Sequence, residues 1–102
     1  MPEIVELHQR ATGVRVADVL PCERDYIVLL DYHEASNVRL WANLRRLRPD
    51  GEVVWAAAAP DPSDIFIRVE WQFGRLIAWT YGCFMMNVDP ETGRCSKKVF
   101  TK

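Results

Sequence analysis

The sequence predicts an all-β fold in which a single domain, residues 1–102, runs as an antiparallel meander of about seven strands. Turn sequences recur along the chain as RPDGE, FGR and DPETGR, and short runs rich in β-branched and aromatic residues separate them. The chain is also short, so nearly every apolar strand face has to be buried. We expect two blade-like units, approximately 26–59 and 65–100, that form a small sandwich or barrel.

The N-terminal segment allows two structures. Residues 2–13, PEIVELHQRATG, fit a short N-terminal helix with apolar residues on one face and Gly13 as its stop, but the same run also fits a strand. Further along, YIVLLDY at residues 26–32 is apolar on both faces, which is typical of a central strand. We therefore expect a strand at 26–32 and leave the N-terminal helix open.

The stretch before the first turn is also ambiguous. In residues 36–48 the leucines and Trp41 fit a helical stripe, and they also fit a loop followed by a strand. We favour the loop and strand, because the Pro-Asp-Gly turn at residues 49–51 requires a strand directly before it. The run EVVWAAAA at residues 52–59 is the strand that follows the turn, and the breaker PDPSD ends it.

The segment around Phe73-Gly74 predicts a hairpin whose register can be checked for consistency. Directly opposed residues share a face of the sheet, and with these two residues as the loop one face is almost wholly apolar. A slip of one residue would scramble both faces. The predicted pairs are Trp71 with Leu76, Val69 with Ala78, and Ile67 with Thr80.

The second face of the strand at residues 75–81 is apolar too. If Gly82-Cys83 is a tight turn, the next strand adds its own apolar side chains to this face. The resulting surface comprises Ile77, Trp79, Tyr81, Phe84, Met86 and Val88. Because such a surface is a solubility liability when exposed, we expect that the N-terminal half of the chain covers it or that it is a subunit or partner interface. Arg68, opposite Trp79, predicts a structural cation–π pair.

Composition argues against several classes of protein. The formal net charge is −1, which does not suit a nucleic-acid or anionic-membrane binder. The arginines around Trp41 could nevertheless contact single-stranded nucleic acid. No segment approaches ~20 consecutive apolar residues, and the N-terminus lacks the basic and then apolar regions of a signal peptide, so we expect a cytoplasmic protein.

The three cysteines are an odd count, which fits a reducing compartment. His8 and His33 have no partner at ligand spacing, so we expect no metal and no cofactor.

Two other groups of residues are candidate sites. Trp41, Trp55 and Tyr32 could line an aromatic pocket for a small ligand. His33 lies near Asp31 in the sequence DYHE, and a histidine beside a carboxylate can serve as a general base. No nucleophile is tied to this pair by spacing, so polar residues at the end of a strand are the better interpretation.

A repeat relates the two halves of the chain. Gly51 and Gly93 follow similar sequences, and their separation is close to the ~40–50 residues of a β-propeller blade. The segment GRLIAWTYGCFMMNVDPETGR resembles a blade of the quinoprotein-like propellers, although a closed propeller needs at least about four blades. The whole chain resembles short stand-alone bacterial proteins of unknown function, some of them carried by mobile gene cassettes. The residues that carry this resemblance are Asn43, Gly51, Trp55, Gly74, Leu76, Ala78, Asp89, Thr92 and Gly93.

The resemblance implies blade-like sheets and brings no activity, and the quinone-binding residues of true quinoproteins have no counterpart in this chain. We therefore expect a non-catalytic β-sheet protein that acts through association, either as a homodimer or as a small partner of another protein, such as an inhibitor or immunity-type factor. A small-ligand binder that uses the aromatic pocket is the alternative. An enzyme that uses His33 and Asp31 is the second alternative.

Overall fold

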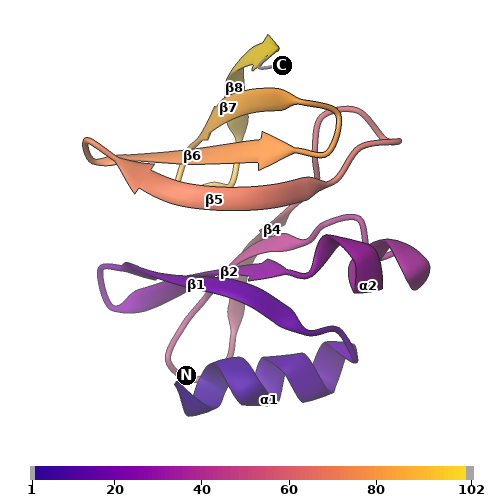
Figure 1. Cartoon of the computed structure of the whole chain (residues 1–102). Helices are drawn as coiled ribbons and strands as arrows, with labels where there is room; N and C mark the ends of the chain where they lie inside the picture. The colour runs from indigo at the N-terminus through magenta and orange to yellow at the C-terminus, as the bar shows by residue number, and fades with distance from the viewer. Residues whose placement is uncertain (1, 101–102) are drawn as a thin grey trace.

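The computed structural model describes residues 2–100, apart from the side chains of residues 97 and 98, and these residues form three layers (Figure 1). Helix α1 lies against a four-stranded antiparallel sheet, which packs against a second four-stranded antiparallel sheet. In both sheets, neighbouring strands follow one another along the chain. The elements are α1 (Glu3–Thr12), β1 (Val16–Cys22), β2 (Asp25–Leu30), α2 (Tyr32–Asn37), β3 (Leu44–Leu47), β4 (Val53–Ala57), β5 (Phe66–Gln72), β6 (Arg75–Thr80), β7 (Phe84–Val88) and β8 (Cys95–Phe100). The fold is mainly β and sandwich-like, as predicted, and the sheets do not close into a barrel.

The N-terminal segment is a helix, which decides between the two structures that the sequence allows. Gly13 ends α1 at a φ of 73°, and its N–H donates to the carbonyl oxygen of Gln9 at 3.0 Å. Val5 and His8 are the residues that α1 buries. The apolar cluster between α1 and the first sheet comprises Val5, Val14, Val16, Val28, Leu30, Ala35, Leu47 and Ile65. Thus α1 covers the outer face of the first sheet.

Strand β2 is the central strand that the sequence predicts. Val28 and Leu30 belong to the cluster under α1, whereas Ile27 and Leu29 belong to the core between the sheets. The sequence does not predict its neighbour β1. This edge strand contains Pro21 and shows no clean alternation of burial, so it lacks the usual pattern of a strand.

Residues 32–37 form the short helix α2, where the sequence predicts the end of a strand. Asp31 caps this helix, because its Oδ2 accepts the backbone N–H of Glu34 at 3.0 Å. A loop then leads into β3, as the turn at residues 49–51 requires. The expectation that the sequence DYHE supplies polar residues at the end of a strand is therefore wrong, because His33 lies in a helix.

The hairpin of β5 and β6 has the predicted two-residue loop. Phe73 and Gly74 take positive φ angles of 50° and 77°, as both central residues of a type I′ turn do. A bulge shifts the far end of the hairpin by one residue, so that Phe66 instead of Ile67 pairs with Thr80. The predicted pairs Trp71–Leu76 and Val69–Ala78 are confirmed.

The predicted register between β6 and β7 is wrong by one residue. The loop between these strands spans residues 81–83 instead of two residues, and Cys83 takes a positive φ of 69°. Trp79 therefore pairs with Met85 instead of Met86. Since side chains alternate between the two faces of a sheet, the shift turns alternate residues of β7 toward the other sheet. These residues are Phe84, Met86 and Val88.

A buried amide joins the two sheets. The side-chain nitrogen of Asn43 donates to the carbonyl oxygens of Leu30, in the first sheet, and Phe66, in the second, at 3.0 and 2.8 Å. Its oxygen accepts the backbone N–H of Phe66 at 3.3 Å. Asn43 is fully buried, so these hydrogen bonds satisfy an amide that would otherwise destabilise the core.

A second connection lies around Trp55. Its indole N–H donates to the carbonyl oxygen of Pro90 at 2.8 Å, and its ring lies so close to Gly93 that a Cβ there would come within 2.6 Å of it. Nearby, the buried Arg46 donates from Nε to Asp25 and from Nη1 to the same carbonyl of Pro90, both at 2.8 Å. Two residues of the sequence pattern, Trp55 and Gly93, therefore hold the β7–β8 loop on the first sheet.

Candidate functional site

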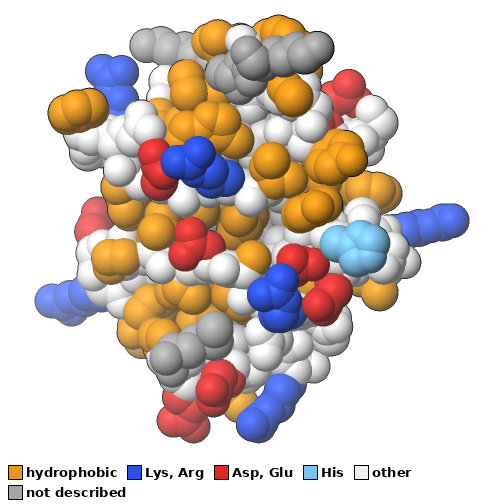
Figure 2. Space-filling model, viewed as in Figure 1, with side chains coloured by type: hydrophobic (Ala, Val, Ile, Leu, Met, Phe, Trp, Pro, Cys, Tyr) orange, Lys and Arg blue, Asp and Glu red, His pale blue; other side chains and the backbone are white. Residues whose placement is uncertain are grey.

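The two sheets differ in what covers their outer faces. Helix α1 covers the first sheet, whereas no described element lies over the outer face of the second sheet (Figure 1). Figure 2 shows hydrophobic side chains at the surface in the upper part of the view, where the second sheet lies, and others lower in the same view. The residues of this outer face, as the strand register assigns them, are Arg68, Glu70, Gln72, Arg75, Ile77, Trp79, Met85, Asn87 and Val99. This open face is the candidate functional site.

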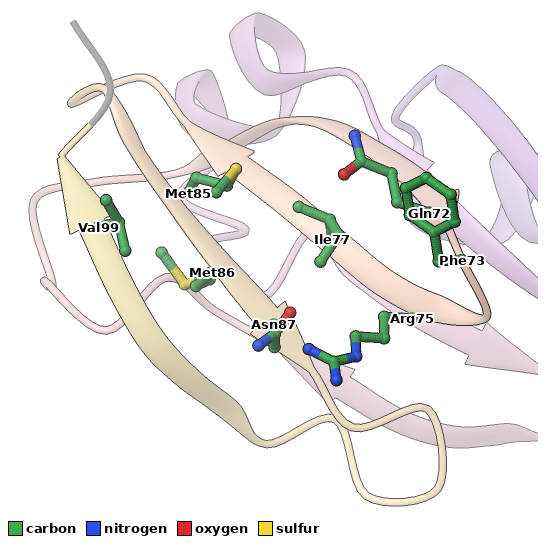
Figure 3. Close-up of a pocket in the computed structure, with 8 residues that line it drawn as sticks. All are labelled: Gln72, Phe73, Arg75, Ile77, Met85, Met86, Asn87 and Val99. Atoms are coloured by element: carbon green, nitrogen blue, oxygen red, sulfur yellow. The ribbon is translucent and has the colours of Figure 1, made fainter.

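A groove runs over the outer face and has a volume of ≈ 440 Å³ (Figure 3). Ile77, Met85 and Val99 supply apolar side chains from three neighbouring strands. The lining also includes Gln72, Phe73, Arg75, Asn87 and Met86, the last with its side chain in the core. The volume is in the range of small-molecule binding sites, roughly 300–1,000 Å³.

Charged and polar side chains of β5 border the outer face. The guanidinium carbon of Arg68 lies 4.5 Å from the ring centroid of Trp79, which confirms the predicted cation–π pair. Arg68 also donates to Glu70 at 2.8 Å, and the amide of Gln72 donates to the other oxygen of Glu70. The hydrogen bond from Gln72, followed by that from Arg68, lowers the pKa of Glu70. The border is therefore a paired network with little net charge.

Phe73 stands at the tip of the β5–β6 hairpin with its side chain fully in solvent, at 104% relative exposure. It takes a φ of 50°, a left-handed conformation that asparagine, aspartate and glycine adopt far more readily than a bulky residue. The ring thus gains no burial that would offset the backbone cost. Costly backbone conformations that no contact within the molecule offsets occur preferentially at functional sites. Phe73 is therefore a candidate functional residue.

The predicted interface is divided between two environments. Ile77 and Trp79 lie on the outer face, and Tyr81 at the end of β6 is 67% exposed. In contrast, Met86 and Val88 are buried in the core between the sheets, and Phe84 packs against the same core. Met86 and Val88 therefore cannot take part in a contact surface, and Phe84 is only partly buried. The outer-face residues that sequence reasoning missed are Met85, Val99 and the exposed Phe73.

The predicted aromatic pocket does not form, because its three residues have different neighbours. Trp55 is buried and hydrogen bonds to the β7–β8 loop. Tyr32 begins α2, and its ring centroid lies 5.7 Å from that of Tyr81. Trp41 is exposed in the loop between α2 and β3. Of these aromatic residues, only Tyr32 extends the surface formed by Tyr81.

The predicted acid–base pair is not assembled either. His33 is exposed on α2, and its ring contacts Tyr32 edge-on, with the centroids 6.5 Å apart. Both carboxylate oxygens of Asp31 are engaged, one by Arg15 at 2.7 Å and the other by the backbone N–H of Glu34. Asp31 thus has a structural role in holding α2.

A different histidine is buried. His8 of α1 places Nε2 3.4 Å from Nη1 of Arg45 on β3. Burial and, to a lesser extent, the charge of Arg45 lower the pKa of His8.

Burial also raises the pKa of Cys22 and of Cys95, which disfavours the reactive thiolate form. None of these groups lies in the groove of the second sheet.

Between residues 2 and 100, apart from the two undescribed side chains, no cluster of three or more His, Cys, Asp or Glu residues could hold a metal ion. Neither helix in that part of the chain is long and apolar enough to cross a membrane.

The fold and the site together define a class: a small two-sheet β protein whose helix covers one sheet and whose other sheet leaves its outer face uncovered by any described element. The chain belongs to a family described as Domain of unknown function (DUF7957), whose model matches residues 4–100. No curated protein and no solved structure matches the chain.

Proposed function

We propose that this protein is non-catalytic and acts through association, with the outer face of the second sheet as its contact surface. The observation that carries the proposal is the open face itself, together with Phe73, which is fully exposed in a costly backbone conformation at its edge. A second copy of the chain is the partner that we place first. The resemblance to short bacterial proteins suggests the narrower form of the proposal, an immunity-type or inhibitory factor in the bacterial cytoplasm.

The composition of the outer face suits a protein contact. Tryptophan, tyrosine, phenylalanine, methionine and arginine are enriched at interfaces, and here they occur together on one sheet. A half-buried Trp79 beneath Arg68 resembles an anchor residue, since it is already partly desolvated before any partner binds. Covering apolar surface contributes about 25 cal/mol per Å², so a contact that seals this face gains from each side chain.

The electrostatics of the outer face also suit self-association. Glu70 neutralises Arg68 within the face, and the whole chain carries a formal net charge of only −1. Two copies would therefore approach without strong repulsion. At the far end, Tyr81 and Tyr32 extend the aromatic surface from the second sheet onto α2.

The proposal is tested by sedimentation of the purified chain at low and high micromolar concentrations. We expect a dimer at the higher concentration. Phe73→Asn and Tyr81→Glu should shift the equilibrium toward the monomer, whereas Leu7→Glu, an exposed apolar position on α1, should not. Circular dichroism verifies that all the variants are folded.

Two outcomes would contradict the proposal. A wild-type chain that remains monomeric at the highest concentration would exclude the second copy as partner. A dimer that both outer-face variants leave intact, or that Leu7→Glu disrupts, would place the contact elsewhere on the molecule.

A further inference from the structure

The groove in Figure 3 has a polar end as well as an apolar middle. Arg75 and Asn87 lie there on neighbouring strands, and their side chains approach one another in the figure. Ser96 pairs with Asn87 across β7 and β8. A second hollow of ≈ 300 Å³ adjoins the groove, sharing Arg75 and Asn87 and adding Ser96. Three hydrogen-bonding side chains from three consecutive strands therefore converge at one end of an apolar groove.

These three side chains have polar groups that are available to a ligand. Within the described part of the chain, no hydrogen bond or ion pair engages the guanidinium of Arg75, the amide of Asn87 or the hydroxyl of Ser96. The other arginine of the outer face, Arg68, is paired with Glu70. Asp89 also lines the second hollow; its Oδ1 accepts the N–H of Glu91 at 2.9 Å within its own turn, and within the described residues its carboxylate forms no ion pair with Arg75. Among the residues that the structure describes, the guanidinium of Arg75 thus has no ion-pair partner at the polar end.

We infer that this groove is a binding site for small carboxylic acids with an apolar tail. The carboxylate accepts hydrogen bonds from Arg75 and Asn87, with Ser96 in reach of the same end. An arginine fork matches the two oxygens of a carboxylate, and an asparagine amide adds a further donor. The tail lies over Ile77, Met85 and Val99, and Phe73 borders it on the hairpin side.

Charge complementarity selects this ligand over a wholly apolar one. A neutral hydrocarbon would fill the middle of the groove and leave the guanidinium of Arg75 unpaired beside it. An anion without a tail would pair with Arg75 in open solvent, where such a contact is weak. Only a molecule with both parts uses the whole groove. The inference is independent of the proposed dimer, but both use the outer face, so ligand and second copy compete for it.

The test is a titration followed in two-dimensional amide NMR spectra, at a protein concentration where sedimentation shows the monomer. The probes are octanoate, kept below its micelle concentration, octanamide as its neutral analogue, and acetate as the head group alone. We expect octanoate to shift saturably the amide signals of β6 and β7 around the groove. Octanamide should bind about twofold to fivefold more weakly, and acetate should produce no saturable shift.

Two variants test whether Arg75 binds the carboxylate of octanoate. Arg75→Gln should lower the affinity for octanoate about twofold to fivefold, to the level of octanamide, while Arg24→Gln, an exposed arginine in the β1–β2 turn, should leave it unchanged. Equal binding of octanoate and octanamide, unchanged binding by Arg75→Gln, or shifts confined to another surface would each overturn the inference. A strict monomer that binds octanoate would refute the dimer alone, and a dimer without octanoate binding in its monomeric form would refute the groove alone.

Discussion

Replacing Gly93 with alanine should destabilise the fold much more than the same change at Gly74. Both glycines lie in turns of the second sheet and have the same φ of 77°. A left-handed backbone costs an alanine about 1–2 kcal/mol at either site, and the loss of unfolded-state entropy offsets part of that cost equally. The two variants therefore share every backbone effect and differ only in what the new methyl group meets.

The structure sets the size of that difference. A Cβ at Gly74 meets nothing within 4 Å, whereas a Cβ at Gly93 would lie 2.6, 2.7 and 3.1 Å from three ring carbons of Trp55. The ring cannot easily retreat, because it is buried and its N–H is held by Pro90. Overpacking of this kind costs about 1–3 kcal/mol, and a weakened hydrogen bond adds about 0.5–1.5 kcal/mol. We expect Gly93→Ala to lose roughly 1.5–4.5 kcal/mol more than Gly74→Ala.

Urea unfolding followed by far-ultraviolet circular dichroism measures both variants without depending on the emission of Trp55. Equal losses at the two sites would refute the reasoning, because they would mean that Trp55 does not seat the β7–β8 loop against the first sheet. A larger loss for Gly74→Ala would refute it more strongly.

Three other predictions follow from single side chains. Phe73→Asn should stabilise the monomer by about 0.5–1 kcal/mol in urea unfolding at low concentration, since asparagine tolerates the left-handed turn and the exposed ring packs on nothing; a loss of stability would show that the ring has an intramolecular contact. Because the folded state lowers the pKa of His8, the unfolded state binds the proton more readily, and stability should fall as pH drops below the ordinary value of 6.5; His8→Gln should flatten this slope in unfolding curves taken at a series of pH values, and an unchanged slope would contradict the prediction. Asn43→Leu should cost about 2–4 kcal/mol by leaving buried backbone groups unpaired, while Asn37→Leu on the exposed end of α2 should stay within about 0.5 kcal/mol, and similar losses would contradict the role of Asn43 between the sheets.

Local patterns were enough to predict part of the fold. The β5–β6 hairpin is specified by Gly74 in the turn and by apolar residues at alternate positions on both strands, all within a short stretch of chain. The central position of β2 follows from a run that is apolar on both faces. The cation–π pair of Arg68 and Trp79 then follows from the register of the hairpin.

Other elements carry no such local signal. In the sequence FMMNV, Phe84, Met86 and Val88 form one apolar face of β7, and the length of the preceding loop decides which face of β6 they join. That loop holds one residue more than a tight hairpin, with Cys83 in a left-handed conformation that favours glycine. An error of one residue was enough to place half of the candidate interface on the wrong side of the sheet.

The sequence by itself determined the mainly β class, most of the turns and the apolar character of both faces of β6, because these depend on the alternation and turn chemistry of neighbouring residues. Only the tertiary structure decided which apolar face is core and which is open. The reason is that α1 covers one face of the first sheet and the second sheet covers the other. Nothing in the described chain then remains to cover the outer face of the second sheet, which is the contact surface that we propose.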